Sequence, residues 1–164
     1  MIERDSAIAL QLHSNVLTLT HHTAAGSVHQ LMTAPLTGIY ALLGQGNLTG
    51  AKVETAISEI EDLIMPALRN LEVSIDLKLA GHALQRIVQL LDNDGKSVSI
   101  AAIECLFNQL VDVANGAPVR LYQVSTAPDD ILALTLLRAV MLHGRFSSAS
   151  LSTSAAHTSS PPRQ

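Results

Sequence analysis

The sequence predicts an all-α fold, a helical bundle of about five or six helices with room for one short β-strand pair. Apolar residues recur at spacings of three and four along most of the chain, as in helices that bury one face. Breaks rich in Gly, Pro and Asn separate these segments, as expected at helix ends. The 164 residues are 48% hydrophobic and 15% charged, so the chain can bury a large core without disulfides or metals.

Two helices are expected in the first third of the chain. The first begins at Asp5 or Ser6, either of which can cap it, and ends near Gly26. Its apolar face repeats at spacings of four, four and three, through Ile8, Leu12, Val16 and Leu19. The second begins at residue 28 or at Pro35 and ends at residue 43, before two glycines.

The middle of the chain is less uniform. A third helix follows Thr49 and extends to about residue 70. Residues 73–79 alternate strictly between apolar and polar, which favours a strand, but a helical period continues directly afterwards. We therefore expect a helix over about 76–91, and leave open whether 73–79 and 119–124 pair as strands.

The last two helices have clear boundaries. Ser97 or Ser99 caps a helix that ends at Asn115, and Pro128 opens the final helix, which Gly144 closes. From Ser147 onward the chain is rich in Ser, Thr, Ala and Pro, a composition that cannot bury enough surface to fold. The expected domains are therefore a helical domain over 1–146 and a disordered tail over 147–164.

The most unusual feature is a segment without charge. Residues 6–51 contain no Asp, Glu, Lys or Arg, whereas a surface helix normally carries charge on its wet face. Depletion of charge is typical of interface cores. We expect this segment to bind a protein partner or a second copy of the chain as a homodimer. The polar residues expected on this interaction surface are Gln11, Asn15, Thr18 and His22.

Overall charge and composition exclude several classes of function. The net charge is −4 and the ten basic residues are scattered, so no nucleic-acid or membrane partner is expected. No apolar run is long enough to span a membrane, and no signal-peptide pattern appears at Met1. A cytoplasmic protein is expected. The single cysteine, Cys105, excludes an internal disulfide and is expected in the core.

No catalytic or metal-binding pattern stands out. No two of the seven histidines lie three or four residues apart, the spacing that a helical metal site needs. The run Gly95-Lys96-Ser97 lacks the earlier glycine of a phosphate-binding loop, because Leu90 stands there. We therefore expect no catalytic residue, no metal and no cofactor. The chain is interpreted as a non-catalytic adaptor, regulator or chaperone-like module, not an enzyme, although an enzyme with a site assembled between helices stays open.

A second alternative rests on His29. The segment from His29 to Ile39, HQLMTAPLTGI, resembles the phosphoacceptor segment of sensor histidine kinases, in which a histidine precedes a Thr-Pro-Leu step. It departs from that family at Gln30, where the family has an acid, and at Pro35, which comes one residue late. The resemblance implies a histidine phosphotransfer protein with His29 as the phosphoacceptor.

Overall fold

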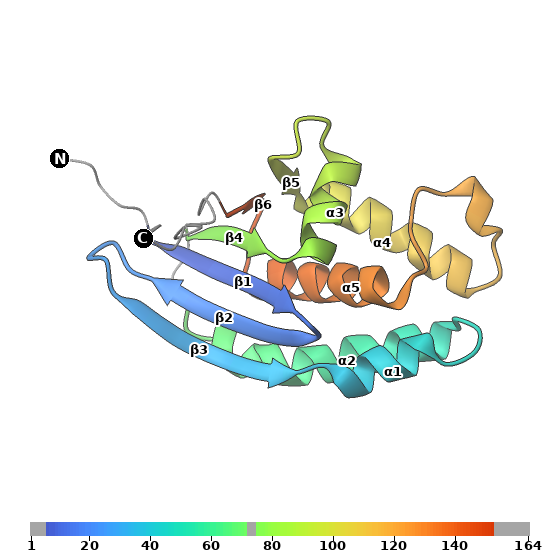
Figure 1. The fold of residues 1–164 in the computed structure, drawn as a ribbon, viewed down its shortest axis with the longest axis horizontal. Helices are drawn as coiled ribbons and strands as arrows, with labels where there is room; N and C mark the ends of the chain where they lie inside the picture. Colours follow the sequence, from blue (N-terminus) through green and yellow to red (C-terminus); the bar gives the residue numbers. More distant parts are fainter. Residues whose placement is uncertain (1–5, 72–74, 153–164) are drawn as a thin grey trace, which may run out of the picture.

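The structure is a computed structural model that describes residues 6–71 and 75–152. It combines a six-stranded sheet with helices, so the expectation of an all-α bundle is wrong (Figure 1). The strands are β1 (Ala7–His13), β2 (Val16–His22), β3 (Val28–Pro35), β4 (Asp76–Ala80), β5 (Ser97–Ser99) and β6 (Ser148–Leu151). The helices are α1 (Thr37–Gly44), α2 (Gly50–Leu68), α3 (His82–Leu91), α4 (Ile100–Ala114) and α5 (Pro128–His143), with a 3₁₀ turn η1 (Val119–Leu121).

The sheet has the order β3-β2-β1-β4-β6-β5. The first three strands form an antiparallel meander, whereas β4 lies parallel to both β1 and β6. Strand β5 pairs antiparallel with β6 and forms the other edge. Strands β1 and β6, from the two ends of the described chain, therefore flank β4 in one sheet.

The first predicted helix is in fact the hairpin β1–β2. Ile8, Leu10 and Leu12 alternate with less buried residues along β1, and their partners Leu17 and Leu19 do the same on β2. Alternation with a period of two places these side chains on one face of the sheet. Leucines at closely spaced positions also satisfy a helical period, which is why the segment was misinterpreted.

The next elements were partly predicted. The segment expected as a second helix divides into β3 and α1, with the break at Leu36. The third helix is confirmed as α2, and the Thr49 side chain accepts the Lys52 N–H at its start. The alternating residues 76–80 form β4, and α3 begins only after Gly81. Residues 119–124 form η1 and a connector, and 72–74 lie outside the described residues.

The last elements agree more closely with expectation. Ser99 caps α4 by accepting the Ala102 N–H, and α5 begins at Pro128 and ends at His143, with Gly144 following it as predicted. However, residues 148–151 of the expected tail form β6 within the sheet. The rest of that segment, from residue 153, lies outside the described residues.

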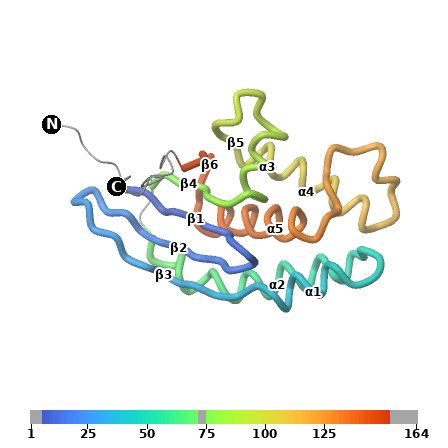
Figure 2. The backbone as a smooth tube through the Cα atoms, in the orientation of Figure 1, coloured from blue at the N-terminus to red at the C-terminus, as the bar shows by residue number. Residues whose placement is uncertain are grey.

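Helix α5 runs through the middle of the helical part (Figure 2). It contacts α1, α2, α3 and α4, and ten of its residues are buried. The buried face of the sheet joins the same apolar core. Within the part of the chain that the structure describes, no helix is both long and apolar enough to cross a membrane.

Candidate functional site

Two parallel strands bring their carboxyl ends to the same edge of the sheet. Strand β1 ends at His13 and β4 ends at Ala80, and the pairing of Gln11 with Ala80 keeps these ends level. Ligands bind preferentially at the carboxyl ends of strands in sheets of this kind. A cavity of about 290 Å³ lies there.

A tight turn forms one wall of this cavity. Ser14 and Asn15 connect β1 to β2, and both have positive φ angles, 50° and 62°. Positive φ at both central residues is the geometry of a type I′ hairpin turn, and it is uncommon at a serine. The Asn15 carbonyl accepts the Leu36 N–H at 2.6 Å, which ties the turn to the end of β3. Backbone strain of this kind is often found at functional sites.

The second wall is the amino end of α3. Gly81 has a φ of +126°, and a Cβ there would lie 2.3 Å from the Leu12 carbonyl oxygen. Only a glycine lets β4 turn into α3 this close to β1. His82 and Arg86 are one helical turn apart, so their side chains share the α3 face beside the cavity.

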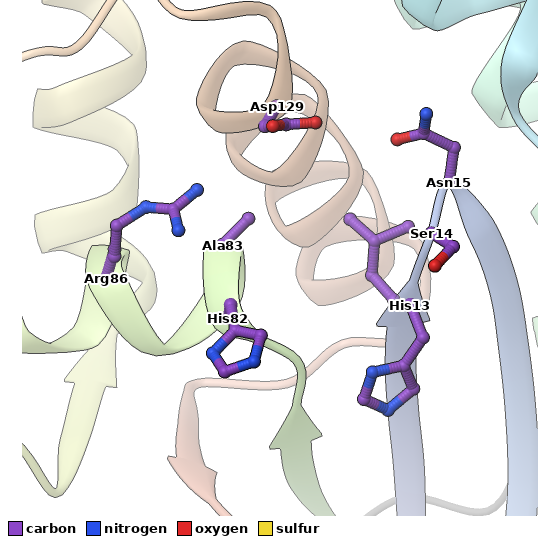
Figure 3. A pocket seen from close by; sticks show the side chains of 8 residues that line it. His13, Ser14, Asn15, His82, Ala83, Arg86 and Asp129 are labelled. Carbon is purple, nitrogen blue, oxygen red and sulfur yellow. The ribbon is translucent and has the colours of Figure 1, made fainter.

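The third wall is the amino end of α5, where Asp129 lies. Figure 3 shows His13 and His82 on the sheet side of the cavity, with Asp129 at the first turn of α5 and Asn15 at the hairpin turn. His13, His82 and Asp129 are exposed, and none of their side chains makes a hydrogen bond to another described residue. These polar groups are therefore available to a ligand.

Arg86 is held in place by the neighbouring acid. Its Nη2 and Nε donate to Asp130 Oδ1 at 2.8 and 3.0 Å, and the Ser125 hydroxyl donates to Asp130 Oδ2 at 2.7 Å. The Asp130 carboxylate thus accepts hydrogen bonds from Arg86 and Ser125, whereas the Asp129 carboxylate accepts none from the described residues. An arginine fixed by one carboxylate still has N–H groups for a second anion, because its guanidinium carries five.

The cavity offers several hydrogen-bond donors to an oxyanion, beside one carboxylate, that of Asp129. Arg86 carries a full positive charge, and histidines supply N–H donors. The amino ends of α3 and α5 add the partial positive charge of their unpaired N–H groups. Among the described residues, no group of three His, Cys, Asp or Glu side chains is placed to hold a metal ion.

The predicted site residues are scattered. Asn15 lines the cavity, but Gln11, Thr18 and His22 lie on β1 and β2. His29 is an exposed residue of β3, paired across the strands with His21. Cys105 is exposed on α4, so its expected place in the core is wrong.

His82 and Arg86 are four residues apart on α3, but no sequence spacing connects them with Asp129, so none of the three was predicted as a site residue. They come from two helices that meet only in the folded chain. One local sign of this site is Gly81, directly after the alternating residues 76–80. A glycine between a strand and a helix lets a neighbouring backbone approach closely.

The sequence matches no family model and no curated protein. The fold, however, is similar to solved structures. One is a Ppx/GppA phosphatase from Aquifex aeolicus in its type II variant, with a TM-score of 0.71, 9% identity and coverage of 91% of this chain and 53% of that one. Another structure of the Aquifex aeolicus Ppx/GppA family member has a TM-score of 0.70 and 10% identity, covering 92% of this chain and 53% of that one.

An exopolyphosphatase from Cytophaga hutchinsonii is also similar, with a TM-score of 0.63 and 9% identity; the match covers 93% of this chain and 54% of that one. This chain spans about half the length of these structures. They are described as phosphatases, which overturns the interpretation of the chain as a non-catalytic helical module. The expected homodimer stays a prediction. At this identity the likeness establishes the fold, which is that of the Ppx/GppA structures.

Proposed function

We propose that this chain is the phosphate-binding part of a phosphohydrolase that removes a terminal phosphoryl group by attack of water. The observation that carries the proposal is the cavity at the carboxyl ends of β1 and β4, with His13, His82, Arg86 and Asp129 around it. The described phosphatases with the same fold support the reaction class.

Each side chain has a role in this reaction. Arg86 neutralises the terminal phosphoryl oxygens, and His13 and His82 donate N–H bonds to them. The Ser14 hydroxyl and the Asn15 amide hold the remaining oxygens from the hairpin turn. Phosphoryl transfer depends mainly on such positioning and charge neutralisation.

Asp129 is the group that orients the attacking water. The water oxygen forms a bond to phosphorus while the P–O bond to the leaving group breaks with its electron pair. One proton of the water passes to the Asp129 carboxylate and from there to the leaving oxygen, and the other stays on the released phosphate. Asp129 suits this role because, unlike Asp130, it makes no ion pair with Arg86.

The test measures phosphate release from tripolyphosphate and from p-nitrophenyl phosphate. We expect Arg86→Ala and His82→Ala each to lower kcat/KM by about 10²-fold or more, as for other groups that stabilise transition-state charge. Arg120→Ala on η1 and His29→Ala on β3 are the matched controls, because neither residue lines the cavity. The proposal is wrong if the chain neither binds nor hydrolyses either compound, or if the Arg86 and His82 variants match the controls.

A further inference from the structure

A second cavity, of about 400 Å³, adjoins the phosphate cavity. It lies between α3, α4, α5 and the connector that follows η1. Its walls are mainly apolar and include Ile87 and Leu90 from α3, Leu106 from α4 and Val124 from the connector. A volume of this size is within the range of about 300–1,000 Å³ that small-molecule sites occupy.

The ion pair of Arg86 with Asp130 lies where the two cavities meet. Arg86 lines both cavities, and the consecutive acids Asp129 and Asp130 line the first and the second respectively. A molecule bound to Arg86 by a phosphate can therefore extend directly into the apolar cavity. The flat face of a guanidinium also stacks well on planar organic groups.

The connector that closes the second cavity is fixed to its surroundings. Gln109 Oε1 accepts the backbone N–H groups of Gln123 and Val124 at 3.0 and 3.3 Å, which anchors the connector to α4. The Ser125 hydroxyl accepts the Ala127 N–H and donates to Asp130. The cavity is thus a preformed site, and a preformed site loses less free energy when it orders a ligand.

The lining also contains an exposed leucine. Leu90 is 42% exposed although it lies on the wall of a cavity. Gln89, Gln123 and Ser125 supply polar groups in the same lining. Apolar walls with a few polar groups are the usual composition of a site for an organic molecule. A chain of inorganic phosphate would find only one cation in this lining, Arg86, which is paired with the Asp130 carboxylate.

We propose that the second cavity binds the uncharged, carbon-rich group of the substrate while the phosphate cavity binds its phosphoryl group. The substrate class is then a phosphate ester of an apolar or aromatic group, not inorganic polyphosphate. This inference rests on the proposed phosphate site, because Arg86 connects the two cavities.

The experiment compares the dissociation constants of 1-naphthyl phosphate and tripolyphosphate for the full chain by titration calorimetry. We expect Leu90→Gln to weaken binding of 1-naphthyl phosphate by about tenfold, the size of effect that small changes in an apolar pocket produce. Its affinity for tripolyphosphate should not change. The matched control is Leu142→Gln on α5, which is equally exposed at 42% and lines neither cavity.

The outcomes separate the two proposals. Suppose that Arg86→Ala weakens binding of both compounds, but Leu90→Gln does not weaken 1-naphthyl phosphate more than tripolyphosphate. The phosphate site is then supported and the proposed site for the organic group is wrong. If the parent chain binds neither compound, both proposals fail. Thermal melting of each variant checks its fold, and Leu90→Ala provides a second, smaller change at the same position.

Discussion

At the scale of single residues, the site depends on backbone positions where almost no side chain fits. Gly81 is the clearest example, because its φ of +126° and its distance to the Leu12 carbonyl leave no room for a Cβ. The contact brings the amino end of α3 against the end of β1. The positions of His82 and Arg86 relative to the hairpin turn therefore depend on residue 81 having no Cβ atom.

We expect Gly81→Ala to lower the free energy of unfolding by at least about 2 kcal/mol, since it adds both an unfavourable φ and a backbone overlap. Urea denaturation at equilibrium measures the change. Gly38→Ala in α1 is the control, because a Cβ there meets nothing within 4 Å. Alanine in a helix is favoured over glycine by roughly 0.5–1 kcal/mol, so Gly38→Ala should not destabilise the chain. Equal stability of the two variants would contradict this account of Gly81.

At the scale of elements, the loop between α3 and β5 is organised by one carboxylate. Asp92 Oδ1 accepts the Asp94 N–H at 3.2 Å, and Oδ2 accepts the Lys96 and Ser97 N–H groups at 3.0 Å each. These backbone hydrogen bonds, that of Ser97 first, hold the pKa of Asp92 below its usual value. The charged form of the side chain is therefore favoured in the folded state.

This pKa shift predicts a dependence of stability on pH. A carboxyl whose pKa is lower in the folded than in the unfolded chain stabilises the fold above the unfolded value of about 4. That contribution disappears as the pH falls through the folded value. Asp92→Asn should thus be less stable than the parent near neutral pH, with the difference shrinking below about pH 4. Denaturation at several pH values measures it.

Asp94→Asn is the control for this experiment, because the Asp94 side chain accepts no hydrogen bond from another described residue. The difference between this variant and the parent should stay small across the same pH range. A difference for Asp92→Asn that grows on acidification would contradict the role given to the Asp92 carboxylate.

At the scale of the whole molecule, α5 joins the parts of the core. Leu132 is fully buried in this helix, and α5 contacts each of the other four helices. We expect Leu132→Ala to lower the free energy of unfolding by about 2–5 kcal/mol through the cavity that it leaves. Leu142→Ala, at a 42% exposed position of the same helix, should have an effect within about 0.5 kcal/mol. Circular dichroism during urea unfolding should show one transition for both variants, and a second transition would contradict the single core.

Local signals predicted where α2, α4 and α5 begin but failed over residues 6–35, which form three strands. The cap at Thr49, the cap at Ser99 and Pro128 at the start of α5 each depend on neighbours in sequence, so they could be recognised directly. Strand pairing depends on residues far apart, such as Ala7 and Asp76. The charge-free residues 6–51 form three strands, helix α1 and the start of α2; β1 and β2 place leucines on the core and uncharged residues such as Thr18 and Thr20 on the other face.

The candidate site was beyond sequence reasoning for the same reason. His13, His82 and Asp129 have no mutual spacing that a pattern could detect, because the cavity assembles from the ends of β1, α3 and α5. Of the residues that line the cavity, the sequence predicts only Asn15 as a site residue, and it predicts it as part of a protein-interaction surface. The turn residues Ser14 and Asn15 between two apolar runs were the one local sign of a hairpin.

The central position of β1 has a consequence for the order in which the chain folds. Hairpin β1–β2 closes through a two-residue turn, and such hairpins form within roughly 1–10 μs. The other neighbour of β1 is β4, and a long loop must close before Ala7 can pair with Asp76. The pairing of β6 with β4 closes another long loop. Non-local pairings of this kind slow folding, since the entropy of closing a long loop is lost before any contact compensates for it. We therefore expect the hairpin to form early with its apolar face uncovered, and the refolding rate to depend on the non-local pairing of β4 with β1 more than on the hairpin.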